Sequence, residues 1–316
     1  MKKIQLILEG INAPITGVVE GNLDGLPCLV LGPASIYIPT LPSELKKQYL
    51  FYGADYYWTN VDNIATDIIS SLNTKQMVVD GERIRTAFEE KGFPVAKTLV
   101  LGESLIGWLA IKQAELYPDK ILGIVNLNTP LTNMKALSEK QSNFFKPYNP
   151  SLTKLATEKS IRLREEHQHL KSKYEIKKNI DFSNNTDDYL AELKREKIRY
   201  MENDILFNKT LSYWENFNIS TRQRFFENVK DIHPEHFKRF IKCPVFLALG
   251  IRDGVVPPYT MVDALRDFPK NFEYYIFDSK HMPQFENQEN FTNQFNEWIS
   301  DNVIKSKPNP IGLSKL

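Results

Sequence analysis

The sequence predicts an α/β fold in which a mostly parallel central sheet is covered by helices on both faces. Short β-rich apolar runs alternate with amphipathic helical patterns, which is typical of parallel sheets. The alternation falls into two blocks, and a charged stretch almost free of glycine separates them. With 316 residues, the chain is long enough for one large α/β domain that carries an insertion.

Each expected helix is predicted by a hydrophobic period, and each expected strand by an apolar run bounded by turn residues. In the first block, strands are expected at Ile4–Leu8, Ile15–Glu20, Cys28–Leu31, Gln48–Tyr52, Lys97–Leu101 and Ile121–Leu127. In the second block, strands are expected at Val245–Gly250 and Phe272–Phe277. Helices are expected at Met77–Lys91, at Ser104–Tyr117 and in a final stretch whose apolar face carries Phe291, Phe295, Trp298 and Ile299.

The two blocks predict one core domain, formed by residues 1–130 and 242–304, with residues 131–241 as a helical cap. The intervening stretch is too long for a loop, and its helical patterns lie at Leu152–Tyr174, Thr186–Phe207 and Ser220–Val229. A coiled-coil arm is the alternative, but no sustained heptad repeat is visible. Residues 305–316, with two prolines, are expected to form a loosely ordered tail.

The most informative motif is Gly102-Glu103-Ser104-Leu105-Ile106-Gly107, which lies between an expected strand and an expected helix. A serine in this position, two residues after a glycine, has the sequence form of a nucleophile elbow. Such a turn strains the serine backbone and exposes its hydroxyl to a base. Ile106 stands where a second glycine is usual, and Gly107 follows, so the close approach of helix and strand is expected one residue later. The alternative interpretation of Ser104 is a helix cap.

A serine nucleophile needs a base, and the base needs an orienting acid. Asp253 follows the expected strand Val245–Gly250, between two glycines, and His281 follows the expected strand Phe272–Phe277. Serine, acid and histidine therefore occur in the chain order that accompanies a nucleophile elbow, each after its own strand. This order predicts that Ser104, Asp253 and His281 converge as a catalytic triad.

These motifs together resemble those of the α/β-hydrolase superfamily over nearly the whole chain. Within it, the stretches Tyr213–Phe226 and Pro244–Gly250 look most like the proline iminopeptidase-like branch, whose members carry a helical cap before the acid-bearing strand. The resemblance implies an oxyanion hole formed by the backbone N–H groups of Ala34 and Leu105. Pro33 has no N–H group, so this assignment depends on the alignment of the loop.

Two features depart from the iminopeptidase pattern. Members of that branch typically carry a His-Gly-Gly-Pro-type loop and a tryptophan directly after the nucleophile, whereas this chain has Leu31-Gly32-Pro33-Ala34 and Leu105. Iminopeptidase activity would also require an acidic cap residue to hold the free amino group of the substrate. Glu202, Asp204 and Glu215 are candidates, and the sequence does not choose among them.

Other candidate residues are assigned lesser roles. Asp278 lies too close to His281 in sequence to approach it from across a site, and Asn126 and Asn128 occupy the place after the sixth strand where some families carry the acid. Glu103 is expected to have a structural or modulating role beside the site.

Metal and nucleotide sites are not expected. The pairs His167-Gln168-His169 and His233-Pro234-Glu235-His236 lie in the charged insertion without a third spaced ligand, so they are interpreted as surface. No phosphate-binding glycine loop is present. We expect no metal and no cofactor.

The predicted function is a cofactor-free serine hydrolase that cleaves a small-molecule carboxylic ester or amide. A proline iminopeptidase-like aminopeptidase and a catalytically silent binding protein of the same fold are the alternatives. The net charge of +1 gives no argument for nucleic acid or an anionic membrane as a partner. Cys28 and Cys243 are expected to be reduced, and the absence of long apolar segments predicts a cytoplasmic protein, whose oligomeric state stays open.

Overall fold

The computed structural model describes residues 1–8, 15–56, 73–132, 137, 201, 204–208, 228, 240–258, 261, 264–265 and 268–305. Within this part of the chain, one eight-stranded sheet has the order β1-β2-β4-β3-β5-β6-β7-β8. The strands are β1 (Lys2–Leu6), β2 (Ile15–Gly21), β3 (Leu26–Val30), β4 (Tyr49–Ala54), β5 (Thr98–Glu103), β6 (Ile121–Leu127), β7 (Val245–Gly250) and β8 (Phe272–Phe277). β2 pairs antiparallel with β1 and β4, and every pairing from β4 to β8 is parallel.

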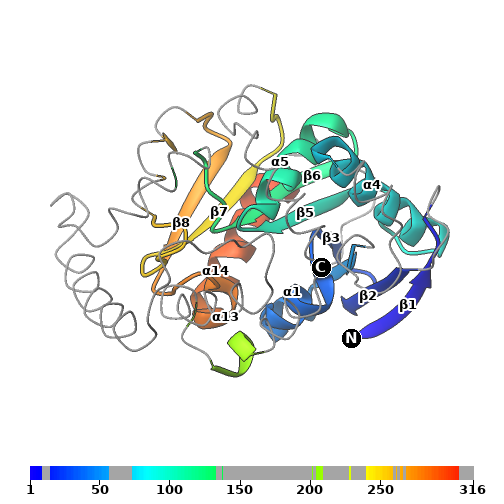
Figure 1. Cartoon of the computed structure of the whole chain (residues 1–316), viewed down its shortest axis with the longest axis horizontal. Helices are drawn as coiled ribbons and strands as arrows, with labels where there is room; N and C mark the ends of the chain where they lie inside the picture. Colours follow the sequence, from blue (N-terminus) through cyan, green and yellow to red (C-terminus); the bar gives the residue numbers. More distant parts are fainter. Residues whose placement is uncertain are drawn as a thin grey trace, which may run out of the picture.

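The structure confirms the predicted α/β architecture with its mostly parallel sheet (Figure 1). The expected strand at Lys97–Leu101 is too short, because Gly102 and Glu103 continue the ladder by pairing with Asn126 and Leu127. A glycine followed by a glutamate gives no strand signal by itself, and the neighbouring strand supplies the missing preference. Glu103 therefore lies inside the sheet, directly before the turn that carries Ser104.

Helices cover both faces of the sheet (Figure 1). The helices are α1 (Ala34–Thr40), α2 (Ser43–Lys46), α4 (Thr74–Glu90), α5 (Ile106–Leu116), α13 (Pro283–Glu286), α14 (Gln288–Trp298) and the π-helix η3 (Ile299–Ile304). In β5, Val100 belongs to the buried cluster that includes α4 and α5 residues, whereas Leu99 and Leu101 belong to the cluster of α1, α14 and η3. The alternating side chains of one strand thus build both cores.

Three short helices were not predicted from the sequence. α1, α2 and α13 have seven, four and four residues, which is too short for a helical period to emerge. α1 also contains Pro39, a residue that usually interrupts helices. These helices flank the loops after β3 and β8, so their positions bear directly on the candidate site.

Part of the expected cap contacts the core domain. Met201, Leu206 and Phe207 are buried in the cluster that also contains Ile38 and Met282. Residues 204–208 are helical but Met201 is not, so the expected helix Thr186–Phe207 is not continuous up to its last turn. The other expected cap helices, at Leu152–Tyr174 and Ser220–Val229, lie almost entirely outside the described residues, as do residues 306–316 of the tail.

No helix among the described segments is both long enough and apolar enough to cross a membrane.

The end of β5 and the start of α5 approach each other very closely. A Cβ atom placed on Gly102 would lie 2.7 Å from the Gly107 Cα atom, and one on Gly107 would lie 1.8 Å from the Thr129 Oγ1 atom. Gly107 thus provides the close approach that the usual second elbow glycine provides. Ile106 instead faces the loop after β3, where its side chain would lie 3.5 Å from a Cβ atom on Gly32.

We predict that Gly107→Ala lowers the free energy of unfolding by about 1–3 kcal/mol, because the new methyl group must displace Thr129 or the start of α5. Chemical denaturation measures the change. The double variant with Thr129→Ala should lose less than the sum of the two single variants, because one substitution relieves the clash of the other. Strict additivity would contradict the proposed contact.

Candidate active site

Four polar residues follow four neighbouring strands at one edge of the sheet. Ser104 follows β5, Asn128 follows β6, and Asp253 and His281 lie in the loops after β7 and β8. These strands are parallel, so their carboxyl ends meet at the same edge, which is where ligands bind in open α/β sheets. The topology therefore brings together the ends of the segments that carry the predicted triad.

Ser104 has the strained backbone expected of a nucleophile elbow. Its φ angle is 53°, in the left-handed region that residues with a side chain rarely occupy. Two hydrogen bonds hold it there: its N–H donates to the Leu127 carbonyl over 2.8 Å, and its carbonyl accepts from the Gly107 N–H over 3.0 Å. The turn is thus fastened to β6 on one side and to α5 on the other.

Asp253 and His281 form a fully buried, hydrogen-bonded pair. The His281 Nδ1 atom lies 2.7 Å from the Asp253 Oδ2 atom, and neither side chain is exposed. A carboxylate only accepts, so Nδ1 carries the proton and Nε2 is the basic nitrogen of the neutral ring. The other carboxylate oxygen, Oδ1, accepts from the N–H groups of Val255 and Val256 over 2.7 and 3.0 Å, so the acid is held at both ends.

Burial and nearby charges act in opposite directions on His281. Burial lowers the pKa of the imidazole, while the charge and hydrogen bond of Asp253 and the charge of Glu286 raise it, and the pKa ends above its usual value. The surrounding carboxyl groups therefore stabilise the imidazolium form. This is the form that a general base must adopt after taking a proton.

The loops after β7 and β8 are joined through their backbones. The Arg252 N–H donates to the Ser279 carbonyl over 2.9 Å. A Cβ atom on Gly250 would lie 1.8 Å from the Lys280 carbonyl oxygen, so a side chain at this position would force the loops apart. Asp278 accepts from Arg252 Nε over 2.9 Å and is largely exposed. Among the two candidate acids, Asp253 is the one that contacts His281.

Asn128 links the acid and base loops through its side chain, a role that sequence reasoning missed. Its Oδ1 atom accepts from the Gly250 N–H over 2.8 Å, and its Nδ2 group donates to the Lys280 carbonyl over 3.4 Å. Its φ angle of 47° is tolerated better by asparagine than by most residues. An asparagine directly after β6, where the acid can lie in some families, was the available signal.

The helix α1 begins at the predicted oxyanion residue. Pro33 is its N-cap residue, and the positive φ angle of Gly32, 89°, turns the chain into the helix. The Ser35 N–H donates to the Asp55 carboxylate over 3.0 Å. Within the described part of the chain, the Ala34 and Leu105 N–H groups have no hydrogen-bond partner. Neither predicted oxyanion donor is therefore occupied by another group of the described residues.

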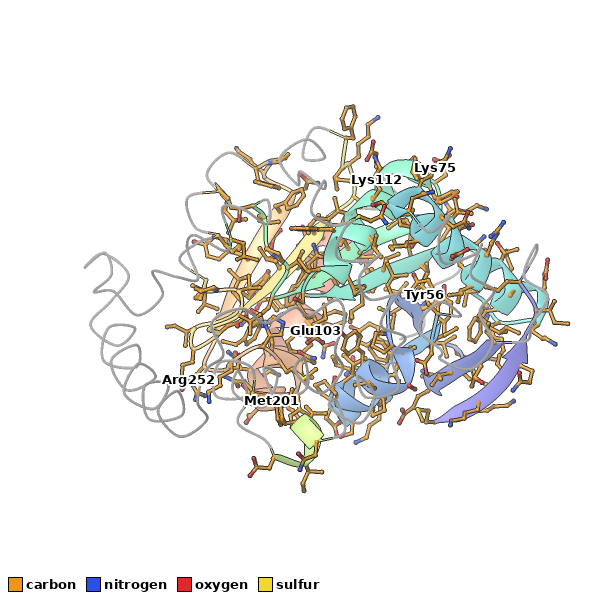
Figure 2. All side chains as sticks on the ribbon, in the orientation of Figure 1. Tyr56, Lys75, Glu103, Lys112, Met201 and Arg252 are labelled. Carbon is orange, nitrogen blue, oxygen red and sulfur yellow. The ribbon has the colours of Figure 1, made fainter. Side chains whose placement is uncertain are left out.

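The segment after His281 is fixed by two further side chains, which sequence reasoning missed. The Glu286 carboxylate accepts from the Lys280 N–H over 2.5 Å, which closes the histidine loop. The Gln284 side-chain amide donates to Thr40 Oγ1 over 3.2 Å and to Glu103 Oε2 over 3.4 Å. Figure 2 shows Glu103 near the centre of the molecule, at the end of β5.

Within the described residues, no group of three or more histidine, cysteine, aspartate or glutamate side chains is arranged to hold a metal ion. The histidine pairs at 167–169 and 233–236 lie outside those residues. Cys28 and Cys243 are free thiols, and burial raises the pKa of both above the usual value. Of the acidic cap candidates, Asp204 is exposed, and Glu202 and Glu215 are not among the described residues.

Comparisons with known proteins agree with this architecture. Residues 82–288 match the alpha/beta hydrolase fold family, which is more than half of the chain. The AB hydrolase superfamily protein YclE of Bacillus subtilis (strain 168) is 22% identical over 291 residues, covering 89% of this chain and 93% of that protein. The chain belongs to the α/β-hydrolase fold family, and the sheet and edge site described above support a hydrolase.

Solved structures with the same fold have several activities. Proline iminopeptidase from Mycobacterium smegmatis superposes with a TM-score of 0.68 and 15% identity, covering 97% of this chain and all of that one. The enol-lactonase from Burkholderia xenovorans LB400 gives a TM-score of 0.65 and 12% identity, covering 94% of this chain and 100% of that one. An esterase from Exiguobacterium antarcticum gives 0.63 and 13%, covering 94% and 98%. At these identities the likeness shows the fold, and the substrate must be argued from the site.

We predict that Asn128→Ala lowers the free energy of unfolding by about 1–3 kcal/mol, because the buried Gly250 N–H loses its acceptor. Urea denaturation measures the loss. Asn126→Leu is the matched control: Asn126 is buried on β6, two residues before Asn128, and its amide has no hydrogen-bond partner among the described residues, so a similar-sized apolar side chain should be neutral or stabilising. An equal loss in both variants would refute the linking role of Asn128.

Proposed function

We propose that this protein is a serine hydrolase that cleaves a carboxylic ester or amide through an acyl-enzyme. The observation that carries the proposal is the buried hydrogen bond between Asp253 and His281 at the sheet edge where Ser104 occupies a strained turn. Strain of this kind persists only where the surroundings impose it, and it is concentrated at functional sites. The family membership supports hydrolysis as the reaction class.

In the proposed mechanism, Ser104 attacks the carbonyl carbon of the substrate while its hydroxyl proton passes to Nε2 of His281. Asp253 holds the ring in the required tautomer and stabilises the imidazolium that forms. The tetrahedral intermediate breaks to the acyl-enzyme as His281 returns the proton to the leaving alcohol or amine. Water then attacks the acyl carbonyl by the same proton transfers in reverse order, which releases the acid and restores Ser104.

The N–H groups of Ala34 and Leu105 are the proposed oxyanion donors. Their lack of partners among the described residues supports this role, since N–H groups are normally paired inside a protein. The Asp55 carboxylate holds the next residue of α1 through the Ser35 N–H, so the start of the helix cannot easily turn away. Pro33, which lacks an N–H group, lies before the proposed donor rather than at it.

An ester substrate is our principal proposal, with a proline iminopeptidase-like amidase as the second candidate. The departures at Gly32-Pro33 and Leu105 favour the esterase. A small-molecule substrate, the absence of a cofactor and a cytoplasmic location belong to the same proposal.

We predict that a fluorophosphonate probe labels the folded protein at Ser104 and that Ser104→Ala abolishes the labelling. Peptide mass spectrometry identifies the modified residue. Ser279→Ala is the control, because Ser279 is a buried serine of the histidine loop outside the proposed triad. Absence of labelling in the wild-type protein would favour the catalytically silent alternative. Hydrolysis of proline anilides in preference to p-nitrophenyl esters would favour the iminopeptidase candidate.

We predict that Asp253→Asn lowers kcat for a p-nitrophenyl ester by roughly 10⁴-fold, because the amide favours the wrong imidazole tautomer. Asp278→Asn makes the same chemical change three residues before His281, and should change kcat less than about twofold, because its surface ion pair with Arg252 contributes little. Steady-state kinetics compare the two variants. A larger loss of kcat in Asp278→Asn than in Asp253→Asn would show that Asp253 is not the orienting acid.

A further inference from the structure

A buried polar network joins three segments of the proposed site. Gln284 on α13 donates through one amide group to Glu103 Oε2 on β5 and to Thr40 Oγ1 on α1. All three side chains are buried, and Glu103 and Gln284 are completely inaccessible to solvent. The network thus connects the end of β5 directly before Ser104, the segment that follows His281 and the helix that begins at Ala34.

Two oxygens of this network have no hydrogen-bond partner among the described residues. They are Glu103 Oε1, the second oxygen of the carboxyl group, and Gln284 Oε1, the one oxygen of the amide whose nitrogen already donates to Glu103. Two acceptors cannot pair with each other, and an unpaired buried acceptor costs free energy. A proton on Glu103 Oε1 converts one acceptor into a donor, and the acid and amide can then form two reciprocal hydrogen bonds.

The charges around Glu103 agree with a neutral carboxyl group. Burial raises its pKa to about 8, the charge of His281 and the Gln284 hydrogen bond lower it, and the charge of Asp253 raises it again. His281 itself is surrounded by the carboxyl groups of Asp253, Glu103 and Glu286. A second full negative charge beside the Asp253–His281 pair would be buried without a cation of its own.

We propose that Glu103 is a positioning residue that acts in its neutral form, pairing with the Gln284 amide to hold the Ser104 turn against the His281 segment. The inference rests on the proposed function. When Glu103 loses its proton to solvent at alkaline pH, its Oε1 again faces the Gln284 carbonyl oxygen, and the two segments separate. Activity therefore falls on the alkaline side for a reason unrelated to the base itself.

The variant Glu103→Gln tests this, because its amide can donate where the protonated acid donates and has no proton to lose in this range. We expect wild-type kcat/KM to fall about tenfold per pH unit above about pH 8, and the variant to stay level. The acid limb, which reports His281, should coincide in the two proteins. If the acid limb of the variant moves to lower pH, Glu103 acts as an anion in the wild-type protein. If the alkaline limb of the variant equals that of the wild-type protein, Glu103 does not titrate in that pH range. Either result overturns the proposal.

Stability gives a readout that does not need catalysis. A carboxyl group whose pKa rises from 4.5 unfolded to about 8 folded stabilises the fold below both values, and this contribution disappears as pH rises between them. The Tm of the wild-type protein should therefore fall relative to that of Glu103→Gln from about pH 5 to about pH 8 and then run parallel. A constant Tm difference across this range would contradict the proposal.

Infrared difference spectroscopy separates this inference from the proposed function. The wild-type protein at neutral pH should show the carbonyl band of a buried protonated carboxylic acid that Glu103→Gln lacks. Glu44→Gln makes the same change at an exposed position on α2 and should leave the band in place. Absence of fluorophosphonate labelling with the band present would defeat the proposed function alone. Labelling at Ser104 with no such band would defeat the role of Glu103 alone.

Discussion

The close contact between the end of β5 and the start of α5 is the constraint on which the rest of the site depends. Only glycines at positions 102 and 107 allow the backbones to approach within the observed distance. That approach forces Ser104 into a left-handed conformation and aligns its N–H with the Leu127 carbonyl. Because the elbow is fastened to β6, the strand neighbours of β6 determine which residues can reach the serine.

Short polar contacts transmit this constraint from strand to strand. Asn128 ties the end of β7 to the histidine loop, and Asp253 fixes His281 while its other oxygen is held by backbone N–H groups. The hydrogen bond from Gln284 to Glu103 connects the segment after His281 to the end of β5, directly before Ser104. Each loop of the site is thus held by at least one buried side chain from another segment, which leaves little freedom for the reacting groups to drift.

Sequence reasoning predicted most of the fold because its signals were long. Eight apolar runs, three helical patterns and the glycine pattern around Ser104 are all visible locally, and the structure confirms the strands and helices with shifts of a few residues. It was less successful where the signal was short or shared between segments. α1 and α13 are too brief to show a period, and Glu103 joins β5 only because Leu127 lies opposite. The roles of Asn128 and Gln284 depend on partners 122 and 181 residues away.

The sequence by itself determined the order of the serine, the aspartate and the histidine and placed each of them after a strand. It also predicted that they meet, because the carboxyl ends of parallel strands lie at one edge of a sheet. The pattern also contained the glycine that replaces the usual one, since Gly107 follows Ile106 directly. The sequence already favoured Asp253 over Asp278, and the folded structure supplied the contacts: Asp253 Oδ2 lies 2.7 Å from His281 Nδ1, whereas Asp278 pairs with Arg252 at the surface. The burial of Glu103 was decided only by the tertiary structure, because the neighbours that exclude solvent from its carboxyl group come from several segments of the chain.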